Sequence, residues 1–156
     1  MTAPVPREQS GYSIPPGVKL AFFDLDETLT DRDTDILWTL WRCRRHPKGL
    51  LELLWMLRLN ARYYRGLLDA ETYMAYHRFR VGGLGMDRLA ALAERFFEQS
   101  GVKHISAGAP GLVRAYRDRG VPTAVITAQQ RFIAVPFARR LGVDEVIGNT
   151  FSIDDR

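Results

Sequence analysis

Two short apolar segments, each ending in a polar residue, most constrain how this chain can fold. Val18–Phe23 is followed directly by Asp24, and the β-branched run Val121–Thr127 ends in a hydroxyl side chain. Continuous apolar runs of this length, bounded by polar residues, are typical of strands buried in a parallel sheet. A third run, Glu145–Ile147, follows after one more helical segment. We therefore predict an α/β fold with a parallel sheet and right-handed crossovers.

Helical patterns separate these runs. Pro110 favours a helix start, and Gly120 supplies a stop before the second strand. Residues 129–141 form the next predicted helix, which Gly142 ends. In such sheets functional groups gather where strands end in loops at their carboxyl edge. Asp24 and Thr127 both occupy such ends, so we expect them near one another.

Between the first and second strands, the chain reads as helical from Thr34 to about Ser100. We expect one helix to bury an apolar face made of residues at i, i+3, i+4 and i+7 spacing: Leu50, Leu53, Leu54, Leu57, Ala61 and Tyr64. Further helices are predicted over 71–79 and 87–99, with three glycines between them. The stretch is predicted to be a helical insertion into the α/β core.

Length and composition exclude several classes of protein. The 156 residues, of which 46% are apolar and 26% charged, suit one globular core. A lone Cys43 excludes an internal disulfide and a cysteine-based metal site. The net charge of +4 is weak support for nucleic-acid binding, and none is expected.

Residues 1–17 contain four prolines and no apolar stretch, so we predict a flexible lead-in rather than a secretory signal. Residues 50–59 are too short to span a membrane, so no transmembrane segment is predicted and a cytoplasmic location is expected.

The strongest chemical feature is the carboxylate pair Asp24 and Asp26 after the first strand. Burying two ionised carboxylates is costly, and a divalent cation such as Mg²⁺ offsets that cost with oxygen ligands. One carboxylate can then attack phosphorus, while the other acts as a general acid and base. The alternative is that both residues are turn or cap residues, which use their side-chain hydrogen bonds locally.

The segment Phe22–Thr30 resembles motif I of the haloacid dehalogenase (HAD) superfamily of phosphatases and phosphotransferases. Ala124–Ala128 resembles its motif II, a strand that ends in a phosphate-binding Ser or Thr. Sequence after motif II resembles the phosphoserine-phosphatase-like branch, subfamily IB, in which a helical cap follows motif I. Thr127 also has a structural interpretation, because with Gln130 it fits a capping box at a helix start.

The resemblance implies a Rossmann-like core formed by residues 18–33 and 101–156, with a helical cap at 34–100. It implies a hydrolase that uses Mg²⁺ to cleave a small phosphorylated metabolite through an aspartyl-phosphate. Asp24 matches the nucleophile and Asp26 the acid/base, and both positions match Mg²⁺ ligands. The positions that match phosphate-binding residues are Thr28, Thr127 and Ala128.

The sequence departs from the family pattern near its C-terminus. No lysine follows Lys103, so motif III is not matched, and Asp154 and Asp155 lack the context of motif IV and are expected to be a solvated tail. We therefore expect a HAD core that is incomplete, with poor phosphatase activity for this chain alone. The first strand would then have an open edge and an uncovered apolar face, which could pair with a complementing C-terminal segment or a second copy. Glu27 also stands where the family most often has glycine.

Other residues leave the substrate open. Arg78 and Arg80 are candidates for recognition of an anionic substrate at a cap–core cleft, with solvated surface arginines as the alternative. Asp31, Asp33 and Asp35 could also recognise substrate, or simply form an acidic helix start. His77 is assigned no role. Two non-catalytic functions stay open: a truncated remnant that binds a partner, and a basic-helix binder of membrane or nucleic acid using residues 38–65.

Overall fold

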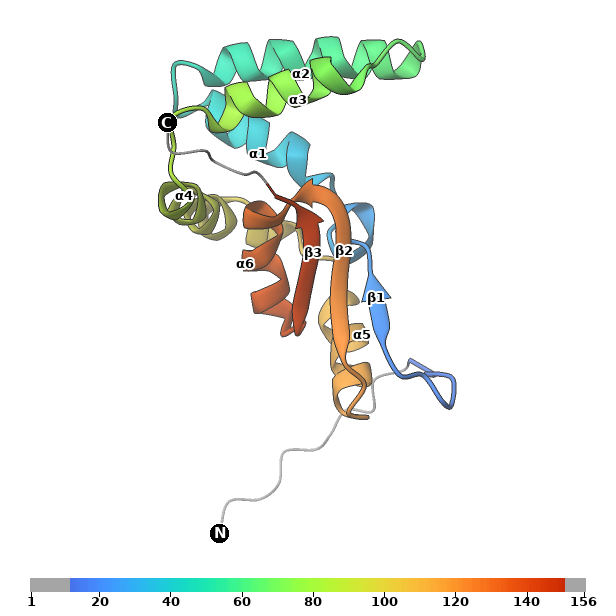
Figure 1. Ribbon diagram of the computed structural model, residues 1–156. Helices are drawn as coiled ribbons and strands as arrows, with labels where there is room; N and C mark the ends of the chain where they lie inside the picture. The colour runs from blue at the N-terminus through green and yellow to red at the C-terminus, as the bar shows by residue number, and fades with distance from the viewer. Residues whose placement is uncertain (1–11, 151–156) are drawn as a thin grey trace.

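The computed structural model describes residues 12–150 and has a small parallel sheet below a layer of helices (Figure 1). Residues 1–11 of the predicted lead-in, together with Asp154 and Asp155, lie outside the described residues. None of the helices within 12–150 is long and apolar enough to cross a membrane.

Three parallel strands form the sheet in the order β1 (Ala21–Phe23), β2 (Thr123–Gln130) and β3 (Glu145–Asn149). Phe23 pairs with Val125, and Val125 pairs with Val146, so the three strands run in the same direction in register. The predicted α/β class with a parallel sheet is confirmed.

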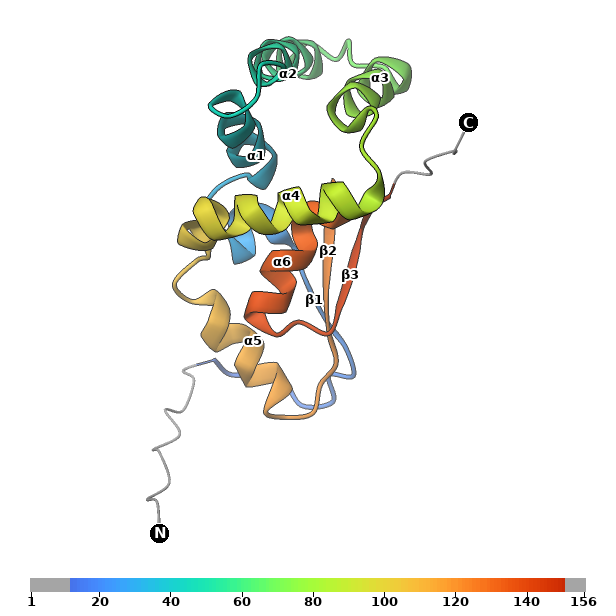
Figure 2. The same ribbon diagram turned by 90° about the vertical axis from the view of Figure 1, so that its left-hand side faces the viewer.

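Within residues 12–150, helices cover only one face of this sheet (Figure 2). Both α5 (Ala109–Arg117) and α6 (Arg131–Leu141) lie on that side (Figure 2). On the other face large apolar side chains stay open to solvent: Leu20 is 45% exposed, Phe22 54%, and Ile126 and Ile147 49% each. Because β1 is also an edge strand among the described residues, the open edge and bare face expected from the sequence are present.

The main hydrophobic core lies between the sheet and its helices and extends into the insertion. Trp38 of α1 (Thr34–Cys43) packs against Phe96 of α4 (Met86–Gln99), with ring centroids 5.4 Å apart, and against Phe132 of α6 at 5.6 Å. Edge-to-face aromatic pairs of this kind add to the stabilisation from apolar burial. The helices α1 and α4 therefore share the core with the sheet.

The middle of the insertion packs separately. The helices α2 (Gly49–Tyr64) and α3 (Ala70–Val81) enclose a second, smaller apolar cluster of Met56, Leu59 and Tyr76. Figure 1 shows this pair of helices at one end of the molecule, above α1 and beyond the carboxyl ends of the strands. The insertion is thus divided by its packing, and the predicted domain boundary at 34–100 stays a prediction.

The predicted buried face of α2 is wrong. Leu50, Leu54 and Leu57 are each more than half exposed, and Tyr64 is 85% exposed. The buried side of α2 instead carries Glu52, Met56 and Leu59. The reason is an ion pair: a Glu52 carboxylate oxygen lies 2.6 Å from Nη2 of Arg42 on α1, and both side chains are buried. A search for repeated apolar residues does not select a face that contains a charged residue. The apolar repeat therefore identified the outer face of α2 instead of the buried one.

The start of α6 also differs from the sequence prediction. β2 continues to Gln130, and the helix begins at Arg131. The Thr127 hydroxyl therefore does not form the expected capping box with Gln130; it accepts a hydrogen bond from the backbone N–H of Gln129 at 3.0 Å. The strand continues because Gln130 pairs with Asn149 of β3 after an irregularity in register. The Gly142 stop is confirmed, with the residue in the left-handed conformation at φ 76°.

Candidate active site

The two residues predicted at strand ends lie on neighbouring strands near the same edge of the sheet, although Thr127 is within β2, three residues before its end at Gln130. β1 and β2 are parallel neighbours, and Asp24 and Thr127 follow the paired residues Phe23 and Val125. Asp24 is exposed, with an extended backbone, and its side chain accepts a hydrogen bond from the N–H of Leu25 at 2.8 Å. Its carboxylate is therefore held by its own turn and still open to solvent.

A closed turn at Leu25–Leu29 directs the next carboxylate. The two leucines that bound the turn are fully buried, and the Thr30 N–H and hydroxyl both donate to the carbonyl of Leu25, at 3.0 and 2.9 Å. Within the turn Asp26 is extended, and Glu27 adopts a left-handed conformation at φ 57°. This conformation is the one that glycine adopts most readily.

Asp26 is fixed by a hydrogen-bond network that joins three elements. Its Oδ1 accepts from both the backbone N–H of Thr34, at 2.7 Å, and the Thr34 hydroxyl, at 2.6 Å. The Thr34 hydroxyl in turn accepts from Nε2 of Gln129 at 2.9 Å. Thr34 begins α1 and Gln129 belongs to β2, so the first and second strand ends are connected through Asp26.

Burial raises the pKa of Asp26 above its ordinary value. The two hydrogen bonds from Thr34 oppose this, since they favour the ionised carboxylate, while the nearby charges of Asp33 and Asp24 raise the pKa further. The balance favours the protonated form of Asp26 more than water does. A half-buried carboxyl of this kind suits a general acid.

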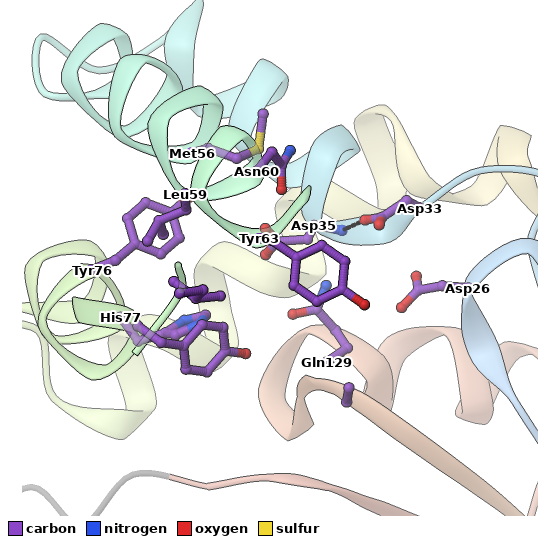
Figure 3. Close-up of a pocket in the computed structure, with 13 residues that line it drawn as sticks. Asp26, Asp33, Asp35, Met56, Leu59, Asn60, Tyr63, Tyr76, His77 and Gln129 are labelled. Atoms are coloured by element: carbon purple, nitrogen blue, oxygen red, sulfur yellow. Dashed lines mark hydrogen bonds between the residues drawn. The ribbon is translucent and has the colours of Figure 1, made fainter. Parts of the chain in front are cut away.

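Asp26 opens into a cavity of about 370 Å³ between the core and the outer helices (Figure 3). The core side is supplied by the ends of the first two strands and the opposite side by α2 and α3. The lining residues are Asp26, Asp33, Asp35, Met56, Leu59, Asn60, Tyr63, Leu68, Tyr73, Tyr76, His77, Ala128 and Gln129. Figure 3 shows the hydroxyl of Tyr63 pointing toward the Asp26 carboxylate.

Of the three residues predicted to bind phosphate, Ala128 lines this cavity, and Thr28 and Thr127 do not. Ala128 lines the cavity together with Asp26, and its carbonyl accepts from Nδ2 of Asn149 at 2.6 Å. Asp24, Thr28 and Thr127 are not among its lining residues, and Thr28 is exposed. The structure therefore brings Asp26 and Ala128 to one cavity and leaves Asp24 and Thr127 at the adjacent sheet edge.

The two arginines predicted to meet substrate do not line this cavity. Arg78 is exposed on α3. Arg80 is buried, and its Nη1 lies 2.5 Å from Oδ1 of Asp35 on α1. The pKa of this guanidinium is raised despite burial, because Asp35 favours the charged form. A role for either arginine in substrate recognition stays a prediction.

The cavity is acidic. It contains three carboxylates, and none of its described lining residues is Lys or Arg. Burial, with the nearby guanidinium of Arg80, lowers the pKa of His77 to about 4, so its imidazole is neutral at pH 7. Burial and the charge of Asp35 raise the pKa of Tyr73, which keeps its phenol protonated. A phosphate dianion would therefore need a cation to accompany it here.

Two carboxylates fit a magnesium ion that keeps most of its water. Asp24 is exposed, and Asp26 uses Oδ1 for Thr34, which leaves its second oxygen outside that network. No group of three or more His, Cys, Asp or Glu among the described residues is arranged to hold a metal. Mg²⁺ is commonly held by one or two carboxylates plus water and substrate phosphate, so the pair suits this ion in number and in kind.

Several site residues escaped the sequence analysis. The sequence analysis expects Thr34 only at a helix start and Gln129 only at the start of the next helix. His77, which had no metal-ligand spacing, lines the cavity from α3. No local signal marks these contacts, because Gln129 lies 95 residues from Thr34 in the sequence.

Comparison with known proteins decides the family. Residues 21–156 match the haloacid dehalogenase-like hydrolase family. The chain belongs to this family. The HAD match includes both strand ends of the site and the whole helical insertion. The resemblance read from the two motifs is therefore confirmed.

The chain is also similar to individual proteins and solved structures. The chain is 29% identical over 133 residues to a histidinol-phosphatase from Neisseria meningitidis, covering 83% of this chain and 59% of that protein. A crystal structure of a protein of unknown function from Bordetella pertussis is 32% identical, with a TM-score of 0.70, and the match covers 84% of this chain and 60% of that one. A phosphoserine phosphohydrolase-like protein from Francisella tularensis shares the fold at 13% identity and a TM-score of 0.57, over 88% of this chain and 61% of that one. The chain thus spans about 60% of the length of these relatives.

Proposed function

We propose that this chain carries the nucleophile and the acid/base of a magnesium-dependent phosphomonoester hydrolase. The observation that supports this most is Asp26: a half-buried carboxyl with a raised pKa, held by Thr34 and open to a cavity beside the sheet edge. Asp24, two residues earlier, is exposed at the end of β1 and is the carboxylate assigned to attack. Family membership and the phosphatase name of the Neisseria relative agree with this assignment.

In the first step an oxygen of Asp24 forms a bond to phosphorus as the bond from phosphorus to the leaving oxygen breaks. The leaving oxygen takes the electron pair of that bond and receives the proton of Asp26. In the second step Asp26 accepts a proton from water as the water oxygen attacks phosphorus, and the bond to Asp24 breaks to release phosphate. Mg²⁺, when bound, would supply positive charge that offsets the phosphoryl oxygens.

The residues around the pair have supporting roles in this proposal. Thr28, Thr127 and Ala128 would orient the phosphoryl oxygens from the sheet edge. Thr34 and Gln129 would hold the Asp26 carboxyl in position, since they connect it to α1 and β2. Preorganised contacts of this type avoid reorganisation during the reaction.

The cavity favours a phosphomonoester whose organic part carries a positive charge. Asp33 and Asp35 add carboxylates, although Asp33 also caps α1 and Asp35 pairs with Arg80. Tyr63 and Tyr73 add aromatic faces on the cap side, which attract organic cations. An amino alcohol phosphate, such as the histidinol phosphate implied by the name of the Neisseria relative, is the first substrate to try.

The test is phosphate release from p-nitrophenyl phosphate and histidinol phosphate by the full chain with Mg²⁺. Asp24→Asn should abolish release, and Asp26→Asn should lower it about 10²- to 10⁴-fold, the usual contribution of a general acid and base. Asp31→Asn is the matched control, since Asp31 pairs with His104 and does not line the cavity. Turnover by this chain is expected to be slow, so ¹⁹F NMR of beryllofluoride bound to the protein provides a second measurement.

Stability separates lost chemistry from lost folding. Asp26→Asn keeps an oxygen that can accept from Thr34 and removes a charge whose burial is unfavourable, so its melting temperature should equal or exceed that of the wild type. Turnover that survives Asp24→Asn, or a bound beryllofluoride signal unchanged by it, would refute the assignment of the nucleophile.

A further inference from the structure

The outward face of α2 carries an exposed apolar row that no described part of the molecule covers. Leu50, Leu54, Leu57 and Tyr64 recur along the helix at intervals of three, four or seven residues, and each is more than half exposed. At 1.5 Å per residue the row is about 21 Å long. Single exposed leucines are ordinary, whereas a continuous apolar stripe of this length marks an interaction surface.

The segment that contains this row is strongly basic. Residues 42–65 contain seven Lys or Arg and one Asp or Glu, a net charge of +6, whereas the whole chain carries +4. The rest of the chain is therefore slightly acidic, at −2. The one acid, Glu52, is buried in its ion pair with Arg42 and faces inward. Five exposed cations make no ion pair with any described residue: Arg44, Arg45, Lys48, Arg58 and Arg65.

The position of α2 leaves this surface accessible. In both views the helix lies at the upper limit of the molecule, beyond α1 from the sheet, and Figure 2 shows α3 beside it (Figures 1 and 2). Its inner side packs against the small cluster of Met56, Leu59 and Tyr76. The helix is therefore held by its inner side, and its leucine row and flanking arginines project away from the protein.

We propose that α2 is an interfacial helix that docks this protein on an anionic phospholipid bilayer. Helices that lie in the plane of a membrane combine an apolar face with basic residues beside it, as α2 does. The apolar row would insert at the level of the acyl chains, and Arg58 and Arg65 would contact lipid phosphates. A second copy would bring two +6 surfaces together, which charge repulsion opposes, and nucleic acid offers no partner for the leucines.

Docking would also orient the catalytic cavity. Met56, Leu59 and Asn60, on the inner side of the same helix, line that cavity. A protein held through the outer side of α2 would therefore keep the cavity within one helix diameter of the bilayer surface. The inference does not depend on the proposed chemistry, since it uses only residues on the opposite side of α2.

The test is sedimentation of the full chain with vesicles of phosphatidylcholine alone or mixed with phosphatidylglycerol. Binding should require the anionic lipid and weaken as salt concentration rises. Arg58→Gln with Arg65→Gln should lower partitioning about thirty-fold at low ionic strength. Leu54→Gln with Leu57→Gln should lower it at least about ten-fold. The matched control is Ile126→Gln with Ile147→Gln, two half-exposed apolar residues on the bare face of the sheet, which should leave partitioning unchanged.

A second measurement reports on the helix directly. Tyr64→Trp places an indole at a position that is 85% exposed, and brominated lipids should quench its fluorescence. The proposal is overturned if Leu54→Gln with Leu57→Gln binds vesicles like the wild type, or if the sheet-face control weakens binding equally. It is also overturned if light scattering shows a lipid-free dimer that this variant dissociates, or if the chain binds DNA and not vesicles.

Discussion

Thr34→Val tests whether the hydroxyl of Thr34 supports the charge on Asp26. The substitution keeps the shape of the side chain and removes the donor that lies 2.6 Å from Oδ1 of Asp26. It also removes the acceptor for Nε2 of Gln129, a buried side chain. A hydrogen bond to a charged group contributes about 1.5–3 kcal/mol, and a buried donor left unpaired costs about 1–3 kcal/mol. We expect a loss of about 2–4 kcal/mol in the free energy of unfolding at pH 7.5.

The loss in the free energy of unfolding caused by Thr34→Val should be larger at neutral pH than at low pH. The pKa of Asp26 in the folded protein is already above its value of 3.8 in the unfolded chain. The contribution of this group to the free energy of unfolding is therefore greatest below pH 3.8 and falls as the pH rises from there through the pKa of the folded state. Thr34→Val removes a contact that lowers the pKa, so it raises the pKa further. Each unit of that increase adds about 1.4 kcal/mol to the destabilisation at neutral pH and nothing below pH 3.8.

Urea unfolding of the wild type, Thr34→Val and Thr34→Ser at pH 7.5 and at pH 4 measures these differences. Thr34→Ser keeps the hydroxyl and should stay within about 1 kcal/mol of the wild type at both values. The reasoning is refuted if Thr34→Val costs the same at both pH values, or if the serine variant loses as much as the valine variant.

Two further predictions concern stability alone, and both are measured by urea unfolding. Glu52→Leu should lower the free energy of unfolding by about 3–5 kcal/mol because it leaves the buried guanidinium of Arg42 unpaired. Glu52→Leu combined with Arg42→Met should be near neutral or stabilising. A loss below about 1 kcal/mol for Glu52→Leu alone contradicts this reasoning. Glu27→Gly should stabilise the protein by up to about 1 kcal/mol, because Glu27 is held at φ 57°, a conformation that costs other residues about 1–2 kcal/mol. Thr28→Gly, at a neighbouring position with negative φ, is its control and should not stabilise; equal effects of the two would disprove the argument from backbone strain.

The sequence predicted the elements whose signals are local. Apolar runs located β1 and β3, and Gly142 ended α6 as expected. The helices expected over 71–79 and 87–99 are present as α3 (Ala70–Val81) and α4 (Met86–Gln99). These predictions succeeded because each depends on residues a few positions apart, so burial and backbone preference act together.

The predictions that failed depend on distant partners. The orientation of α2 follows from the ion pair of Glu52 with Arg42, which an apolar repeat cannot detect. The extension of β2 follows from pairing between Gln130 and Asn149 on another strand. For the candidate site, the sequence proposed Asp24 and Asp26 but not Thr34, because the contact of Thr34 with Asp26 and Gln129 forms only when α1 and β2 come together.

The pair of helices α2 and α3 is fastened to α1 by two internal ion pairs, Arg42 with Glu52 and Asp35 with Arg80. Its own apolar cluster has three buried members, far fewer than the main core. Such a unit opens locally at a lower free energy than the whole protein, so its amide protons should exchange with solvent first. This helical hairpin forms one wall of the cavity, so substrate entry and product release would depend on its local opening. The two ion pairs would set how often the hairpin opens.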